Sequence, residues 1–229
     1  DRRGRRSLQK ADLQDFFKEN GSKLIVALAI LVLIVVGISK YNESSKAQAS
    51  QEASELGKAM TLVYAGESSQ ALVELESLMA SNKLSGLSLA KAALLAGNIK
   101  YQNRDFEGAG KLFDLSVAEA GSATIVLAAA MHGQAAVSME KKDFQKAITQ
   151  WEAFIAKFGN RTGNLEARYS KEESVDEVSI VSDAMWLLTL CYKETGDMAK
   201  AKATAEKLQK IYGDKPEVAA KVQKFFATL

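Results

Sequence analysis

Apolar residues follow two different patterns along this chain of 229 residues. Residues 24–39 read LIVALAILVLIVVGIS, a run that holds twelve large aliphatic side chains and no charge. Beyond residue 40, apolar positions recur with helical spacing, and short polar breaks separate one amphipathic segment from the next. The first pattern predicts a helix that is apolar on every side, whereas the second predicts a series of helices with one buried face each.

The amphipathic part of the chain repeats itself. Four segments share a polar break, an acidic or aromatic residue, an alanine three or four positions later, and apolar residues four and seven positions beyond the alanine. The four alanines are Ala71, Ala109, Ala147 and Ala201, spaced by 38, 38 and 54 residues. Because the third spacing equals one period plus sixteen residues, the pattern predicts a repeated helical hairpin with one insertion. An irregular α-helical bundle is the alternative interpretation.

This register resembles that of the tetratricopeptide repeat, in which a small residue early in the second helix lets the two helices approach closely. Phe113 and Trp151 match the large residue that follows one turn later, and Phe106 and Phe144 match the aromatic residue that opens the second helix. Gly97 falls at the small position of a first helix. The resemblance implies an all-α solenoid of about four hairpin units whose role is to bind other proteins.

Two further segments fit around the hairpins. Residues 160–181 form the predicted insertion, which contains the acidic residues Glu172, Glu173, Asp176 and Glu177. This acidic cluster favours a solvated loop face, and weak binding of a cation is the alternative. Gly213 and Pro216 are typical of a helix end and a helix start, so residues 215–229 are predicted to form a C-terminal capping helix.

The uncharged run predicts a single transmembrane helix over residues 24–40, because each of its aliphatic side chains favours membrane insertion. The alternatives are a buried core helix and a signal peptide with the A-x-A site that ends at Ala49. Residues 1–23 carry seven Lys and Arg, whereas residues 40–60 carry three. This difference predicts a cytoplasmic basic arm over residues 1–23 and a periplasmic repeat domain over residues 41–229 of a bacterial inner-membrane protein.

Composition excludes several classes of function. A net charge of +2, with basic and acidic residues interleaved beyond the arm, argues against nucleic-acid binding. Cys191 and His132 are the only residues of their kinds and lie 59 positions apart, which argues against a metal site or a catalytic pair built from them. We therefore expect no catalytic residue, no cofactor, no metal and no small-molecule substrate. An enzyme or a ligand-binding receptor is the least favoured class.

The N-terminal segment FFKENGSK, Phe16 to Lys23, runs straight into the apolar span, and an exit with Tyr41 and a helix rich in Ser, Ala and Gln follow. This part of the chain resembles the YfgM-type family of ancillary subunits of the SecYEG translocon. The resemblance implies a non-enzymatic helper whose partners are translocon subunits, a periplasmic chaperone or exported polypeptides. A scaffold subunit of another envelope machine, in cell division, outer-membrane assembly or motility, is the alternative.

The repeat register also predicts a protein-binding groove. In a tetratricopeptide superhelix the first helix of each hairpin lines the concave face, and transferring its groove positions selects Asn98, Tyr101, His132, Met139, Trp186 and Lys193. Two aromatic rings, a flexible methionine and several polar groups suit apolar or extended polypeptide segments. The alternative is a place in the core for Trp186 and Met139 and a role in packing for His132.

Overall fold

The computed structural model describes residue 40, residues 44–164, residue 176 and residues 178–229. By its internal contacts the chain divides into two units, Asp1–Gln51 and Glu52–Leu229. The predicted basic arm, and all but the last residue of the predicted transmembrane segment, lie outside the described residues. Within the described part of the chain, no helix is both long and apolar enough to cross a membrane.

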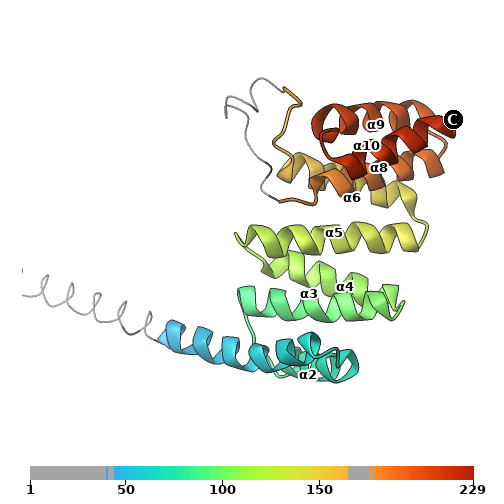
Figure 1. The fold of residues 1–229 in the computed structure, drawn as a ribbon. Helices are drawn as coiled ribbons and strands as arrows, with labels where there is room; N and C mark the ends of the chain where they lie inside the picture. Colours follow the sequence, from blue (N-terminus) through green and yellow to red (C-terminus); the bar gives the residue numbers. More distant parts are fainter. Residues whose placement is uncertain (1–39, 41–43, 165–175, 177) are drawn as a thin grey trace, which may run out of the picture. The chain divides into compact units, whose positions relative to one another are not determined.

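The second unit is built from α-helices that pair into hairpins (Figure 1). Its first helix covers residues 52–64. The helices that follow are α2 (Ser68–Ala80), α3 (Gly86–Gln102), α4 (Phe106–Glu119), α5 (Thr124–Glu140), α6 (Phe144–Phe158), α8 (Val181–Glu194), α9 (Met198–Tyr212) and α10 (Pro216–Ala227). Helix 52–64 with α2, α3 with α4, α5 with α6, and α8 with α9 form the four predicted hairpins, and α10 is the predicted capping helix. The all-α hairpin solenoid is therefore confirmed.

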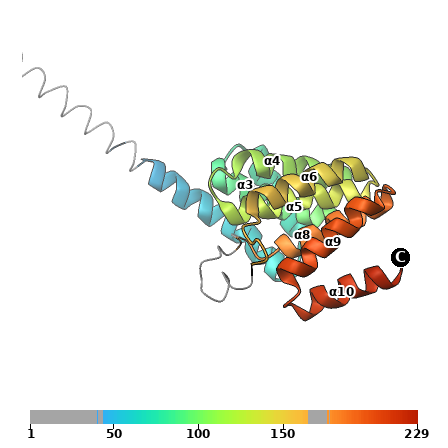
Figure 2. The same ribbon diagram turned by 90° about the horizontal axis from the view of Figure 1, so that it is seen from above.

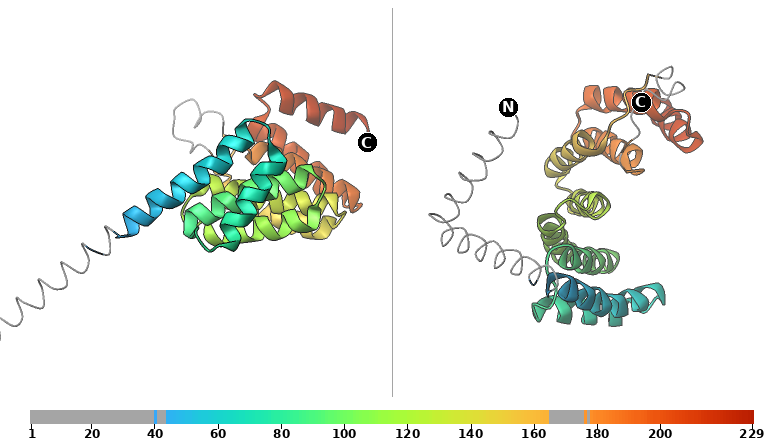
Figure 3. Two further views of the ribbon diagram at one scale, coloured as in Figure 1. Left: turned by 90° about the horizontal axis from the view of Figure 1, so that it is seen from below. Right: turned by 90° about the vertical axis from the view of Figure 1, so that its left-hand side faces the viewer.

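The hairpins of this unit stack in sequence order, as Figure 1 and the right-hand view of Figure 3 show; Figure 2 looks along the stack from above. Extensive contacts join α2 to α3, α3 to α4, α4 to α5, α5 to α6, α6 to α8, α8 to α9 and α9 to α10. One further pair, α3 with α5, joins the first helices of two successive hairpins. Each helix of the stack is thus held by its nearest neighbours along the chain, as in other repeat proteins.

The buried alanines confirm the predicted repeat register. Ala71, Ala109, Ala147 and Ala201 lie early in α2, α4, α6 and α9 and are 0% exposed. A methyl group at these positions lets the second helix of each hairpin approach the first closely, because a larger side chain would hold the two backbones apart. The large residues one turn later are buried as well; they are Leu75, Phe113 and Trp151.

Each turn inside a hairpin has the same backbone geometry. One residue adopts a left-handed conformation, and these residues are Gly66, Arg104, Lys142 and Gly196, with φ of 80°, 63°, 59° and 78°. The amide of the following residue donates to the carbonyl five positions back, as Asp105 does to Lys100 over 2.9 Å. This arrangement satisfies the last carbonyl groups of the first helix and ends it sharply.

An aspartate then starts the second helix in three of the four turns. Asp105, Asp143 and Asp197 are the N-caps of α4, α6 and α9, and each carboxylate accepts a hydrogen bond from the backbone amide three residues later. Such a cap satisfies one of the free amides at a helix start and stabilises the helix by about 1 kcal/mol. The polar breaks between the repeats therefore specify the turns that close the hairpins.

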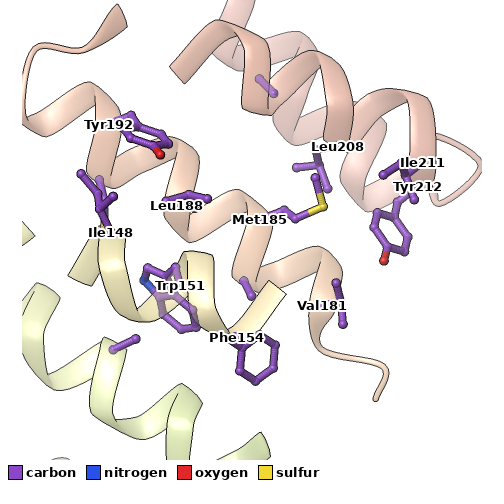
Figure 4. Packing of buried hydrophobic residues seen from close by; sticks show 14 of the residues in the cluster. Ile148, Trp151, Phe154, Val181, Met185, Leu188, Tyr192, Leu208, Ile211 and Tyr212 are labelled. Atoms are coloured by element: carbon purple, nitrogen blue, oxygen red, sulfur yellow. The ribbon is translucent and has the colours of Figure 1, made fainter. Parts of the chain in front are cut away.

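Buried side chains form two large clusters of different composition. The aliphatic core joins helix 52–64, α2 and α3, and its buried members are Leu56, Ala59, Ala71, Leu75, Leu78, Leu84, Ala92, Ala96 and Ile99. The aromatic core joins helices from α5 to α10, and its buried rings are Trp151, Phe154, Phe158, Tyr192, Tyr212 and Phe225 (Figure 4 shows part of it). Between them lies a small cluster around Phe113.

Phe113 occupies a slot between two glycines. A Cβ atom added to Gly97 of α3 would stand 2.9 Å from the Phe113 ring, and one added to Gly133 of α5 would stand 2.7 Å from it. Both glycines are therefore required for the close approach of the ring to two helices. Gly97 was predicted to be the small residue of its helix, whereas Gly133 comes from the next hairpin.

Asp176 holds the two ends of the insertion together. Its carboxylate accepts hydrogen bonds from the backbone amides of Asn160 and Arg161 over 2.9 and 3.1 Å, and the Tyr212 hydroxyl donates to it. The Arg161 side chain lies 3.7 Å from the same carboxylate. With 9% of its side chain exposed, Asp176 is not part of a solvated face, so that prediction is wrong for this residue. Glu172, Glu173 and Glu177 lie outside the described residues.

Candidate interaction surface

The six predicted groove residues all lie on the first helices of their hairpins. Asn98 and Tyr101 are on α3, His132 and Met139 on α5, and Trp186 and Lys193 on α8. Asn98 and Lys193 are exposed, whereas the other four side chains are half-buried. The structure brings His132 and Met139 together on Trp151, and Trp186 and Lys193 together on Phe225. A shared role of all six residues in binding stays a prediction.

Tyr101 connects the second hairpin to the third. Its ring packs edge-on against Phe106 with 5.5 Å between centroids, and its hydroxyl donates to the Glu140 carboxylate over 3.3 Å. Partial burial, and then the negative charge of Glu140, raise the pKa of Tyr101 above its ordinary value. The hydroxyl therefore remains protonated at neutral pH and acts as a donor at this junction.

His132 and Met139 both pack on Trp151. The His132 ring lies edge-on to Trp151 with 4.9 Å between centroids, and the Trp151 Nε1 group donates to the Met139 sulfur over 3.3 Å. Burial lowers the pKa of His132, and the charge of Asp183 opposes this only in part. His132 is therefore neutral at pH 7 and packs against the aromatic core, in agreement with the packing interpretation of this residue.

Trp186 and Lys193 both contact Phe225 of the capping helix α10. The Phe225 ring of α10 stands edge-on to Trp186 with 6.2 Å between centroids. The Lys193 ammonium lies 5.8 Å from the centroid of the same ring, a distance typical of a cation–π contact. Part of the Trp186 surface is thus covered by α10, while Lys193 keeps its charge at the surface.

A row of acidic residues joins the hairpins, and the sequence analysis missed it. We call Glu76, Asp114, Glu152 and Glu206 the acid row; each lies five residues after the repeat alanine of its helix. Three of them contact the first helix of the next hairpin: Glu76 pairs with Lys100 at 3.0 Å, Asp114 accepts from Gln134 at 2.6 Å, and Glu152 accepts from Tyr192. The constant offset from the alanines was the signal that could have revealed the row.

Members of the acid row border the clefts between successive second helices. The cleft between α4 and α6 has a volume of about 130 Å³ and is lined by polar groups such as Asp114, Gln134 and Gln150. The cleft between α6 and α9 has a volume of about 420 Å³ and a more apolar floor that includes Met185 and Leu188. The two clefts share the acid-row position, Asp114 in one and Glu152 in the other, and differ in chemistry.

The described side chains give little support for a catalytic or metal site. Burial raises the pKa of the Cys191 thiol to about 11, so this cysteine is protonated at neutral pH and a poor nucleophile. Among the described residues, no group of three or more His, Cys, Asp or Glu is placed to hold a metal ion.

The fold and register define a helical-hairpin repeat protein. The model of the tetratricopeptide repeat-like domain matches residues 14–173, and a tetratricopeptide repeat model matches residues 183–214. The chain therefore belongs to the tetratricopeptide repeat-like domain family, whose repeats indicate a protein–protein interaction scaffold. No curated protein matches the chain.

Solved structures of several repeat proteins are similar to this chain. A tetratricopeptide repeat protein from Parabacteroides merdae is 15% identical, with a TM-score of 0.56 over 78% of this chain and 61% of that one. The MamA protein is 17% identical, with a TM-score of 0.53 over 75% of this chain and 79% of that one. MamA from Desulfovibrio magneticus, from residue 41 onward, is 15% identical with a TM-score of 0.51, over 73% of this chain and 79% of that one. At such low identity these likenesses show the fold alone.

Proposed function

We propose that this protein is a membrane-anchored scaffold whose repeat unit stands in the bacterial periplasm and assists exported proteins beside the Sec translocon. Its cytoplasmic arm would be residues 1–23 and its anchor residues 24–40. Its partners would be translocon subunits, a periplasmic chaperone or the exported polypeptides themselves. It would take part by binding and would perform no chemistry of its own.

The observation that carries this proposal is the order of features along one chain. An uncharged run of sixteen residues, preceded by seven Lys and Arg, comes before a stack of interaction repeats. The charge difference favours a cytoplasmic N-terminus, which would send everything after residue 40 across the membrane. The resemblance of residues 16–50 to the YfgM-type family supports the translocon as the neighbour.

Topology is the first test of the proposal. A reporter that is active only in the periplasm, fused after Leu229, is expected to be active in the full chain. Replacement of Arg2, Arg3, Arg5 and Arg6 by Glu is expected to weaken that activity, because the arm then loses its positive bias. Four Lys→Arg changes in the repeat unit, which keep every charge, serve as the matched control. A reporter that is active only in the cytoplasm would end the localisation part of the proposal.

Crosslinking in native membranes tests the partner. A photo-reactive amino acid at Asn98 or Lys193, both exposed on first helices, is expected to give adducts with translocon subunits or exported chains. The same group at Lys207, exposed on the second helix α9, is the control position. Recovery of one stoichiometric machine for division, outer-membrane assembly or motility would instead support the alternative scaffold role. Equal adducts at Lys207 would move the binding surface away from the first helices.

A further inference from the structure

The two edges of the hairpin stack differ in charge. The loops between hairpins lie along one edge, on the left in Figure 1, and the turns inside the hairpins lie along the other. Residues 81–89, which lead from α2 into α3, carry one charge, and residues 120–127, which lead from α4 into α5, carry none. By contrast, residues 140–146, around the turn from α5 into α6, carry five charges. We call residues 81–89 and 120–127 the loop edge.

The loop edge exposes two apolar side chains at the same repeat position. Leu87 and Ile125 are 42% and 69% exposed and lie 38 residues apart in the sequence. Each is the second residue of a first helix, Leu87 in α3 and Ile125 in α5. Because the Cα–Cβ bonds of a helix tilt toward its N-terminus, both side chains lean toward the loop edge. Since α3 and α5 are in contact, the two side chains lie one repeat apart on neighbouring helices.

The helix starts at the loop edge also have free amide groups. The N-cap residues of α3 and α5, Ser85 and Ala123, make no side-chain cap hydrogen bond, whereas aspartates cap α4 and α6 at the opposite edge. The Ser85 hydroxyl instead donates to the Glu52 carboxylate over 2.9 Å. The first-turn amides of α3 and α5 are therefore available to donate to phosphate oxygens, which bind favourably at helix starts.

The chain leaves for its proposed anchor from the same edge. The Glu52 carboxylate accepts from the Ser85 amide and hydroxyl over 3.3 and 2.9 Å, so helix 52–64 and α3 begin side by side. Residues 44–51 are helical and rise by about 12 Å, and residues 41–43 add at most about 11 Å. The start of helix 52–64 therefore lies within roughly 25 Å of the end of an anchor at residues 24–40.

We propose that the loop edge rests on the phospholipid surface of the membrane, with Leu87 and Ile125 in the headgroup region. This inference depends on the proposed function, because it requires the anchor at residues 24–40. The two apolar side chains enter the boundary between headgroups and acyl chains, while the free amides of α3 and α5 donate to lipid phosphates. The exposed Lys83 adds a positive charge that favours anionic lipids. A weak contact is sufficient, because the anchor keeps the edge at a high effective concentration beside the bilayer.

The contact is confined to the first three hairpins. Farther along the same side of the stack come the insertion and the charged starts of α8 and α10, which carry Asp183, Lys215 and Glu217. Two other exposed rings, Tyr64 and Phe226, lie at the opposite ends of their helices and so at the other edge of the stack. The part of the chain nearest the anchor is thus the part that touches lipid.

Fluorescence quenching tests the contact with the full chain inserted in vesicles of zwitterionic and anionic phospholipid. A polarity-sensitive fluorophore on Ser122→Cys, an exposed loop position before α5, is expected to shift to the blue and to be quenched by headgroup-labelled nitroxide lipid. The matched control is Asn103→Cys, exposed in the turn at the other end of α4, where neither change is expected. Cys191 is buried, so the unchanged chain gives the labelling background.

A second change in the Ser122→Cys background tests the two apolar side chains. Leu87→Asp and Ile125→Asp together are expected to abolish the blue shift and the quenching, because carboxylates are disfavoured in the interface and repelled by anionic lipid. An acidic residue in the first turn favours a helix, so circular dichroism should show that α3 and α5 remain. Val73→Asp, at a position that is 68% exposed on α2 and outside the loop edge, is the matched control and should change nothing.

Four outcomes would overturn the proposal. If alkaline carbonate extracts the chain from the vesicles, the anchor fails, and with it both this proposal and the membrane part of the proposed function. If the chain stays inserted but Ser122→Cys is quenched no more than Asn103→Cys, the lipid contact fails while the anchor stands.

Quenching that a folded Leu87→Asp, Ile125→Asp chain retains would show that these side chains do not make the contact. If that chain does not fold, the comparison of Ser122→Cys with Asn103→Cys decides alone. The last outcome is a protein adduct from a photo-reactive group at Ile125 in native membranes, together with no quenching in vesicles. The loop edge would then belong to a partner protein.

Discussion

The aliphatic core and the aromatic core are built on the same repeat and filled in different ways. In the aliphatic core the buried side chains are Ala, Leu and Ile, and the helices come close together. In the aromatic core, Trp151, Phe154 and Phe158 alone place three rings on one helix, each within about 6 Å of the next. A buried aromatic ring removes about 150–250 Å² of surface from water, far more than an alanine. We therefore expect the hairpins from α5 onward to be the more stable part of the stack.

The largest expected effect follows from removing Trp151. Trp151→Ala leaves a cavity beside His132 and Met139, and is expected to lower the free energy of unfolding by about 3–5 kcal/mol. The matched change in the aliphatic core is Leu75→Ala, since both side chains are fully buried. Urea unfolding with amide hydrogen exchange should show that Trp151→Ala exposes helices of both cores, whereas Leu75→Ala exposes mainly helix 52–64 and α2. The reverse pattern would place the stable part at the other end.

The second effect concerns the contact that holds the insertion to the aromatic core. Asp176→Ala removes a carboxylate that accepts two backbone hydrogen bonds and one from Tyr212, and is expected to cost on the order of 2–3 kcal/mol. The control is Asp183→Ala, which breaks an exposed ion pair with Lys221 and should cost less than about 1 kcal/mol. Equal midpoints in thermal unfolding for the two variants would show that the contact contributes no more than a surface pair.

A smaller effect, which stabilises the fold, is expected at the turns inside the hairpins. Arg104 and Lys142 adopt left-handed backbone conformations, and in the other two turns a glycine occupies the same position. Arg104→Gly should therefore raise the free energy of unfolding by about 0.5–1 kcal/mol, because a side chain is disfavoured in that conformation. Gly196→Ala is the converse change and should lower it by a similar amount. A lower melting temperature for Arg104→Gly would mean that the Arg104 side chain, 6.0 Å from the Phe106 ring, stabilises more than the conformation costs.

The smallest effect is a dependence on pH that arises from His132. Its pKa is below the ordinary value of 6.5 because burial disfavours the charged form, so the unfolded chain binds the proton more readily. This contribution to stability is present above the unfolded pKa and is lost as pH falls below about 6.5. Urea midpoints between pH 7.5 and 5.5 should fall less for His132→Gln than for the unchanged chain. Parallel pH profiles would show that other groups cause the whole dependence.

The repeat could be predicted from the sequence because each hairpin is specified locally. Within each hairpin the sequence places a repeat alanine after a polar break, and in two of them an aromatic residue follows one turn later. All of these residues have the predicted places in the structure. Gly133 could not be found in this way, because its requirement comes from Phe113, a residue of the preceding hairpin. The same holds for Asp176, whose partner Tyr212 lies 36 residues away.

The candidate surface was less predictable than the fold. The register placed the six groove residues on the correct helices, but it could not tell how much of each side chain its neighbours cover. His132 and Met139 pack on Trp151, and the capping helix α10 covers part of the Trp186 side chain. The contacts of the acid row were not predicted, because charged residues are common on the exposed faces of all helices and do not by themselves indicate a contact.

The nearest-neighbour contacts of the stack have a consequence for synthesis. Among the described residues, extensive contacts join only helices that follow each other along the chain, except for the pair α3 and α5. A chain that emerges N-terminus first can therefore close each hairpin, and lay it on the one before, without waiting for a distant segment. Loops that close over such short separations cost little entropy and form fast. Docking of each new hairpin on the one before it covers part of its apolar face, which shortens the time during which that face is open to aggregation.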